Sequence, residues 1–247
     1  MIARIAEVYR RTRKPKDLLW NRFVARPLAA VVLVPIEATT VTPNQITLGT
    51  LLVFVGAAAA MALAPSWGGL LAAVGLLELA YVLDCVDGQL ARLRGTSTPI
   101  GAHLDFLMDE LKAFLLVAAV GVRLWRAGGE ARWLLEGLAA LVAVASAISL
   151  TTFLRRPEYA TATGAARNLG LGDYGEGFAA AAPPAGFSVK RAVESAGSLI
   201  VHYPSYIVFV ALFNRMDLFL HAYLLVNAAH VGRSLLAITW KLGRRAA

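Results

Sequence analysis

Six long apolar segments limit what this chain of 247 residues can fold into. A helix needs about 20 apolar residues to cross a bilayer, and several of the segments have that length. Hydrophobic residues make up 58% of the chain, which exceeds the usual share in soluble proteins. The pattern predicts an all-α integral membrane protein with six transmembrane helices. We place these helices at residues 44–63, 69–92, 100–122, 132–154, 198–213 and 217–238.

The region before the first apolar segment has a different character. Residues 1–43 are rich in basic side chains. From Asp17 onward, apolar and basic residues recur at helical spacing on opposite faces, which is typical of an amphipathic helix in the membrane interface. We therefore expect a cytoplasmic basic segment with an interfacial helix at residues 1–43 and a six-helix transmembrane domain at 44–247. Glycines and prolines within that domain predict a long cytoplasmic loop at residues 155–197.

The distribution of Lys and Arg predicts the orientation in the membrane. An even number of spans places both termini on one side, and most basic residues fall on that side, which the positive-inside rule assigns to the cytoplasm. The net charge of +8 fits anionic lipid headgroups better than nucleic acid, because the basic residues border apolar segments and form no aromatic-lined groove. We expect a multi-pass protein of the cytoplasmic membrane. The arginines on the opposite side are exceptions: Arg123, Arg126, Arg132 and Arg215.

Four aspartates lie where the second apolar segment ends and the third begins. Asp84 and Asp87 are three residues apart and therefore share one face of a helix. Asp105 and Asp109 are four apart and do the same. A glycine and a proline between the pairs permit the chain to reverse. We expect the four carboxylates to converge in a cleft that opens to the cytoplasm.

Such a cleft needs positive charge, because close carboxylates repel one another by roughly several kcal/mol at intermediate dielectric. All-oxygen ligation suits Mg²⁺, Mn²⁺ or Ca²⁺, and shared carboxylates can hold two ions. The small Gly88 and Ala91 would let a diphosphate approach the backbone, and Arg92 would neutralise it. Helix-end ion pairs with Arg92, Arg94 and Lys112 are a structural alternative that suits one acid better than four, since acids within spans usually mark functional sites.

These residues complete the pattern D-x2-D-G-x2-A-R-x8-G-x3-D-x3-D, which resembles the signature of the CDP-alcohol phosphotransferase (CDP-alcohol phosphatidyltransferase) family. The sequence T-P-N-x-x-T at the start of the first apolar segment, the six spans and the interfacial helix also resemble that family. The resemblance extends from about residue 15 to residue 155 and is looser beyond. The pattern is filled by Asp84, Asp87, Gly88, Ala91, Arg92, Gly101, Asp105 and Asp109.

The resemblance implies a homodimeric membrane enzyme that uses Mg²⁺ or Mn²⁺, with two ions in the site. It would pass a substituted phosphate from a CDP-linked alcohol to an acceptor hydroxyl and release CMP. The resemblance implies Asp84, Asp87 and Asp105 as metal ligands, and Asp109 as both ligand and general base. The residues expected to contact the CDP or its diphosphate are Asp84, Gly88, Ala91, Arg92, Thr98 and Gly101. Candidates for acceptor or phosphate contacts are Arg155, Arg156 and Lys112.

The two substrates stay open at this point. One possibility is CDP-diacylglycerol with a small polar alcohol; the other is a polar CDP-alcohol, such as CDP-inositol, with a lipid or soluble acceptor. We expect at least one of the two to be a lipid. A carboxylate-lined cation carrier or an intramembrane aspartyl protease would be different functions. Both fit less well, because the acids gather at one cytoplasmic mouth beside an arginine.

Overall fold

The computed structural model of the chain describes residues 1–14, 17–163, 200 and 202–243. The regular elements in these residues are all helical, with no strand among them, which confirms the all-α prediction. Before the long helices come α1 (Ile2–Thr12), a π-helical turn η1 (Asn21–Ala25) and α2 (Arg26–Ile36). The long helices are α3 (Pro43–Leu63), α4 (Trp67–Arg94), α5 (Pro99–Gly128), α6 (Arg132–Leu154) and α10 (Met216–Gly243). The shorter elements are α7 (Pro157–Thr163), η3 (Tyr203–Ser205) and α9 (Ile207–Leu212).

Three of the described helices are long and apolar enough to cross a membrane, namely α3, α4 and α6. Helices α5 and α10 are at least as long as these, but charged and polar side chains are spread along them. The prediction of one continuous helix over residues 198–213 is wrong. The described part of that stretch holds the turn η3 and the six-residue α9, which is far shorter than the roughly 20 residues of a span. Pro204 lies in this stretch and lacks the N–H that a continuous helix would need.

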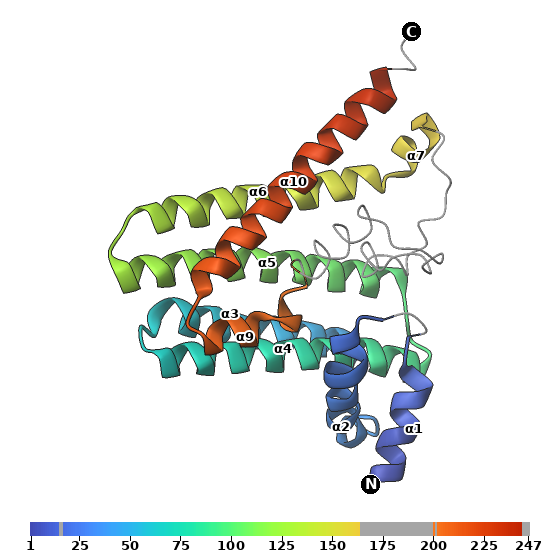
Figure 1. Cartoon of the computed structure of the whole chain (residues 1–247). Helices are drawn as coiled ribbons and strands as arrows, with labels where there is room; N and C mark the ends of the chain where they lie inside the picture. Colours follow the sequence, from blue (N-terminus) through green and yellow to red (C-terminus); the bar gives the residue numbers. More distant parts are fainter. Residues whose placement is uncertain (15–16, 164–199, 201, 244–247) are drawn as a thin grey trace, which may run out of the picture.

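The long helices pack side by side around one core. In Figure 1, α3 packs against both α4 and α5, α6 covers the other side of α5, and α10 crosses α6. Phe54, Leu77, Val120 and Phe219 are fully buried where these helices meet. Outward-facing side chains stay apolar, as Leu52 shows with 72% exposure. Apolar residues on both faces of a helix are typical of membrane proteins.

The N-terminal residues form a separate helical layer. Helices α1 and α2 stand across the end of the molecule where α4 leads into α5 (Figure 1). Fully buried residues from both, including Val8 and Leu33, pack against Val86 and Leu90 of α4. The helix predicted from Asp17 onward is present as η1 and α2, whereas α1 is an additional helix. The π-helical turn ends two residues before Pro27, whose missing N–H and ring disrupt the regular α-helical bonds.

Local capping signals bring the helix ends together as the sequence predicts. Thr42 accepts a hydrogen bond from the Gln45 backbone N–H and so begins α3, with Pro43 at the first helical position. Helix α4 ends at Gly95, whose φ of 66° is favourable for glycine. Thr98 caps α5 by accepting from the Gly101 backbone N–H at 3.1 Å. The end of α4 and the start of α5 therefore lie close together.

The predicted loop at residues 155–197 is partly helical. Pro157–Thr163 form α7, which begins with proline and has Glu158 in its first turn, a favourable helix start. Residues 164–197 lie outside the described part of the chain.

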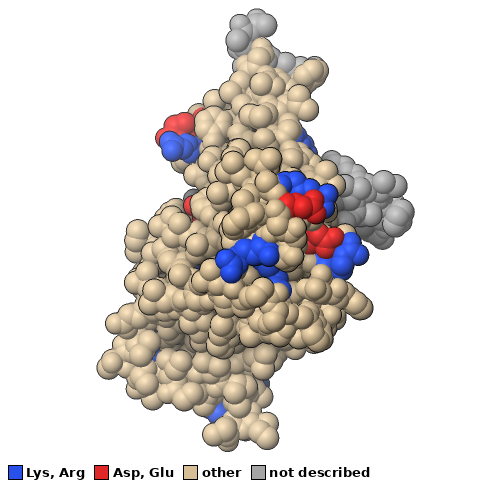
Figure 2. All heavy atoms as spheres, turned by 90° about the vertical axis from the view of Figure 1, so that its left-hand side faces the viewer, with Lys and Arg blue, Asp and Glu red and all other residues tan. Residues whose placement is uncertain are grey.

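Three of the four arginines that are exceptions to the positive-inside rule have local partners. They lie at the end of the bundle away from α1 and α2. Arg132 pairs with Glu130 at 2.9 Å, and Arg215 pairs with Asp217 at 2.8 Å. Arg123 is buried and donates to backbone carbonyls where α3 turns into α4, including Ala64 at 2.6 Å. Figure 2 looks onto this end and shows small groups of basic and acidic residues on a largely uncharged surface. Local pairing therefore accounts for most of these exceptions.

Replacing Arg123 by methionine is expected to destabilise the fold by about 2 kcal/mol, because the carbonyls at the end of α3 lose a charged donor. Equilibrium unfolding in detergent micelles measures this loss. Arg126→Met, an exposed arginine three residues later on the same helix, is the matched control. Equal stability of the two variants would show that the guanidinium of Arg123 does not hold the α3–α4 turn.

Candidate functional site

The structure brings three of the four predicted aspartates together. They lie at the end of the bundle that carries α1 and α2. Asp84 of α4 and Asp105 and Asp109 of α5 each offer a carboxylate oxygen, and these oxygens lie within 4.8 Å of one another. Asp84 and Asp105 are partly buried, whereas the Asp109 side chain is 54% exposed. The cluster therefore has a covered inner side and an open outer side.

Asp87, the fourth predicted ligand, is held beside this group. Its carboxylate is buried and accepts a hydrogen bond from the Thr47 hydroxyl of α3 at 2.6 Å. It still lies close enough to Asp105 for electrostatic repulsion. The T-P-N-x-x-T sequence thus contributes its last threonine to the acidic site, and α3 forms a third wall.

Lys112 supplies positive charge within the cluster. Its ammonium forms an ion pair with Asp84 across the α4–α5 contact and contacts Asp109 one helical turn before it, at 3.0 Å. The lysine side chain is only 6% exposed, so this is a buried pairing rather than a surface one. In the structure Lys112 is thus a counter-ion of the acids, and its contact with a phosphate stays a prediction.

The donor set fits a divalent cation. One carboxylate oxygen of Asp105 is buried and has no hydrogen-bond partner in the described part of the chain. A buried carboxylate oxygen is costly unless something compensates its charge. The neighbouring ligand atoms are also carboxylate oxygens, the type that Mg²⁺ and Mn²⁺ prefer.

Beside the acids, the side chain of Arg92 lies over the small Gly88 of α4. A Cβ atom added to Gly88 would come within 3.3 Å of a terminal nitrogen of Arg92. Arg92 also donates its Nε to the Thr12 carbonyl at 2.8 Å, and Ala91 is half-buried next to it. The guanidinium is therefore held over the glycine at a fixed place.

The two remaining residues predicted to contact the diphosphate lie at the start of α5. Thr98 is exposed and uses an oxygen lone pair to cap the helix, which leaves its hydroxyl proton available for donation. A Cβ on Gly101 would approach the Thr98 hydroxyl to 3.2 Å and the Asn44 amide oxygen to 3.6 Å. A side chain at position 101 would therefore be tight against the hydroxyl that caps α5.

The two arginines predicted to contact the acceptor follow α6. Arg155 lies over the ring of Phe106, 5.6 Å from its centre, and Phe106 directly follows Asp105. Arg156 is exposed. The structure thus brings Arg155 to the helix that carries Asp105 and Asp109.

A hydrogen-bonded group one helical turn before Asp84 was not predicted. The Tyr81 hydroxyl donates to the Asn21 amide oxygen at 2.5 Å and contacts His202 Nε2 at 2.8 Å. Asn21 in turn donates to Asp17 at 2.9 Å. The partners are 60 and 121 residues away from Tyr81 in sequence, so no local pattern signals them. This group joins the N-terminal layer and the segment before α9 to α4, the helix that carries Asp84 and Asp87.

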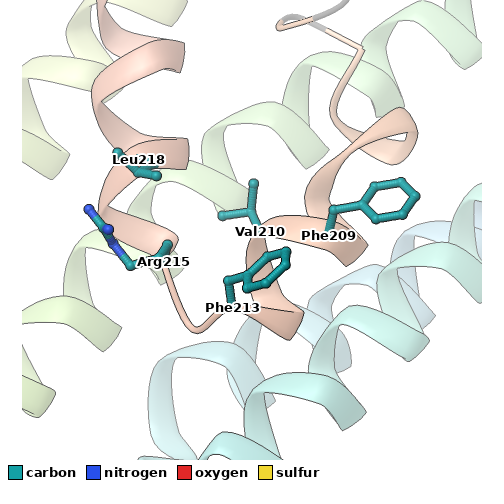
Figure 3. Close-up of a pocket in the computed structure, with 5 residues that line it drawn as sticks. All are labelled: Phe209, Val210, Phe213, Arg215 and Leu218. Carbon is teal, nitrogen blue, oxygen red and sulfur yellow. The ribbon is translucent and has the colours of Figure 1, made fainter.

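A second concave feature lies away from the acids. Figure 3 shows a groove between α9 and the start of α10, lined by Phe209, Val210, Phe213, Leu218 and Arg215. Its basic residue is already paired with Asp217, and the lining is otherwise apolar. The acidic cluster, rather than this groove, carries groups suited to chemistry.

The fold and the acidic cluster define a helical protein with a group of carboxylates that come from α4 and α5 and lie within reach of one cation. Residues 40–171 match the model of the CDP-alcohol phosphatidyltransferase family, and the chain belongs to that family. This finding confirms the resemblance seen in the motif. All four aspartates, and Thr47 which donates to Asp87, lie within the matched residues.

A curated relative is the "Bifunctional IPC transferase and DIPP synthase" of Aquifex aeolicus (strain VF5). The two sequences are 34% identical over 83 residues, which is 34% of this chain and 18% of the relative. The match thus spans less than a fifth of the relative's length.

Proposed function

We propose that the protein is a divalent-metal-dependent transferase that moves a substituted phosphate from a CDP-linked alcohol to an acceptor hydroxyl and releases CMP. The observation that supports this most is the group of Asp84, Asp105 and Asp109 oxygens within 4.8 Å, in the family-matched part of the chain. Gly88 and Arg92, which lie beside this group on α4, would contact the diphosphate of the donor.

The donor would lie along α4. The small Gly88 and Ala91 would let the diphosphate approach the backbone, and the Arg92 guanidinium, which lies over Gly88, would offer phosphate oxygens its Nη2, which is unpaired among the described residues. At the start of α5, the Thr98 hydroxyl and the backbone around Gly101 would contact the same group. These residues orient the donor and stabilise the charge on CMP as it departs.

Asp109 is placed to act on the acceptor. Its carboxylate is the exposed member of the cluster, and Lys112 holds one of its oxygens at 3.0 Å. The other oxygen can accept the proton of an acceptor hydroxyl that enters from the open side. Arg155, beside Phe106, would bind an anionic group of the acceptor, with Arg156 at the entrance.

Asp84, Asp87, Asp105 and Asp109 are the residues that would hold the metal, which we take to be two Mg²⁺ or Mn²⁺ ions. Bound there, the ions would neutralise the diphosphate charge and help CMP to leave. Four carboxylates with one internal lysine carry a formal charge of −3, and the diphosphate of the donor would supply the remaining negative charge for two divalent cations.

We further propose that the protein is a multi-pass homodimer of the cytoplasmic membrane, with both termini and the cleft on the cytoplasmic side. The apolar helices support the membrane location, and the basic N-terminal layer beside the cleft supports the orientation. At least one substrate would be a lipid. CDP-diacylglycerol and a polar donor such as CDP-inositol are both compatible with the open side of the cluster.

Asp109→Asn is expected to lower CMP release by at least about a hundredfold, because an amide cannot take the acceptor proton. Binding of CDP should stay within about threefold of wild type, because the isosteric side chain keeps the cleft intact. Purified protein with Mg²⁺ is supplied with CDP-diacylglycerol or CDP-inositol and a panel of acceptors. CMP is quantified, and the second product is identified by mass spectrometry.

Glu110→Gln is the matched control, because this neighbouring acid lies outside the cluster. Robust CMP release by Asp109→Asn would rule out Asp109 as the base. If wild-type protein releases no CMP from any CDP-alcohol and instead conducts cations in liposomes, a carboxylate-lined carrier is the better explanation.

A further inference from the structure

Helix α1 lies outside the family-matched residues 40–171, yet it touches the residues that define the site. Its attachment is specific. Arg4 forms two hydrogen bonds with the Glu37 carboxylate, at 2.8 and 2.7 Å, and the Tyr9 hydroxyl donates to the Arg22 carbonyl at 2.9 Å. The charged pair lowers the pKa of Glu37 from its ordinary value, because Arg4 donates to the ionised carboxylate. Helix α1 is thus fixed to the start and the end of the η1–α2 segment.

The C-terminal end of α1 meets the catalytic motif directly. Thr12 is fully buried, and its backbone carbonyl accepts the Arg92 Nε at 2.8 Å. The Nη2 of Arg92 is buried and has no hydrogen-bond partner among the described residues. One side of the guanidinium is therefore bound to α1, while the other side retains a donor beside Gly88.

Lys14 follows two residues after Thr12 and brings a second positive charge to the same place. It is half-buried and lies close enough to Asp105 for electrostatic attraction. The Arg92 guanidinium also lies close enough to Asp105 for electrostatic attraction. The two cations thus approach the acidic cluster from different elements, Lys14 from the N-terminal layer and Arg92 from α4.

We propose that α1 forms a wall of the donor site and that Lys14 binds the diphosphate of the CDP-linked donor together with Arg92. This inference rests on the proposed transferase function and adds a residue from outside the family motif. A lysine is a flexible point charge that suits phosphate, and beside metal-bound carboxylates it would favour a ligand that carries several negative charges. Arg4 and Glu37 then act as positioning residues, because they hold the helix that presents Lys14.

Lys14→Gln is expected to weaken CDP binding about tenfold, the loss typical of one charge-assisted hydrogen bond. Binding of cytidine, which lacks phosphates, should change less than twofold. Isothermal titration of the full-length protein in detergent with Mg²⁺ measures both. Arg10→Gln, which removes the same charge from an exposed position of α1, should leave CDP affinity unchanged, and Lys14→Arg should retain most of it.

The anchoring of α1 is tested by charge reversal. Arg4→Glu should raise the KM for the CDP-alcohol about fivefold with little change in kcat, because the donor wall is displaced while Asp109 is not. Adding Glu37→Arg should restore the KM by re-forming the ion pair with opposite polarity. A loss that came from general destabilisation would lower the melting temperature and would not be confined to KM.

The outcomes separate this inference from the proposed function. If wild-type protein binds CDP and Lys14→Gln binds it within twofold of that affinity, Lys14 has no role at the donor site and the inference fails alone. If wild-type protein binds no CDP at all, the proposed function fails and the inference falls with it. A tenfold loss confined to CDP, together with rescue of Arg4→Glu by Glu37→Arg, supports the inference.

Discussion

Asp105→Asn is expected to reduce CMP release roughly a thousandfold, the scale of losing a main electrostatic contributor to catalysis. Asp105 has a buried carboxylate oxygen without a hydrogen-bond partner among the described residues, and its ligand atom lies within 4.8 Å of those of Asp84 and Asp109. An amide keeps the shape but removes the negative charge that would hold a cation. Initial rates over a Mg²⁺ titration measure the effect.

A second readout does not depend on turnover. Mn²⁺ should raise the melting temperature of wild-type protein, because a ligand that binds only the folded state stabilises it, and the rise should be much smaller in Asp105→Asn. Glu110→Gln should behave as wild type in both measurements. An Asp105→Asn protein with an undiminished Mn²⁺ shift would remove Asp105 from the metal ligands.

Gly121→Val is expected to cost about 3 kcal/mol of stability, at the upper end for overpacking in a core. Helices α5 and α6 pack with their backbones in contact at Gly121. A Cβ added there would lie 3.0 Å from the Gly137 Cα and 3.3 Å from the Trp133 carbonyl oxygen. Backbone atoms cannot move aside as a side chain can. The helices would have to separate over their whole contact, and unfolding in mixed micelles would report the loss.

Gly56→Val in α3 is the matched control, since nothing lies within 4 Å of the position of its added Cβ. Both changes replace a helical glycine with the same β-branched residue, so differences in helix propensity cancel. Equal destabilisation of the two variants would show that the α5–α6 contact is not the cause.

Features set by neighbouring residues in the sequence could be predicted. The cap at Thr42 and the reversal after Gly95 depend on a few adjacent residues, and the structure has both. The convergence of the aspartates follows from helical spacing on two helices joined by a short turn. Asp84, Asp105 and Asp109 meet as expected for this reason.

Other features depend on contacts between distant segments and have no local signal. The pairing of Lys112 with Asp84 requires the rotation of α4 against α5, which spacing within one helix does not define. Tyr81 meets His202 only in the folded protein. The apolar composition around Pro204 predicts a span, because composition alone does not show the break in the helix.

The bond between Arg92 and α1 has a consequence for how the N-terminal layer can change during evolution. Arg92 binds the main-chain carbonyl of Thr12, not its side chain. Every amino acid offers that carbonyl, so the bond places no demand on which residue occupies position 12. Position 12 can therefore diverge in sequence while Arg92 keeps the end of α1 beside the acidic cluster, whereas positions 4 and 37 are held to a charged pair.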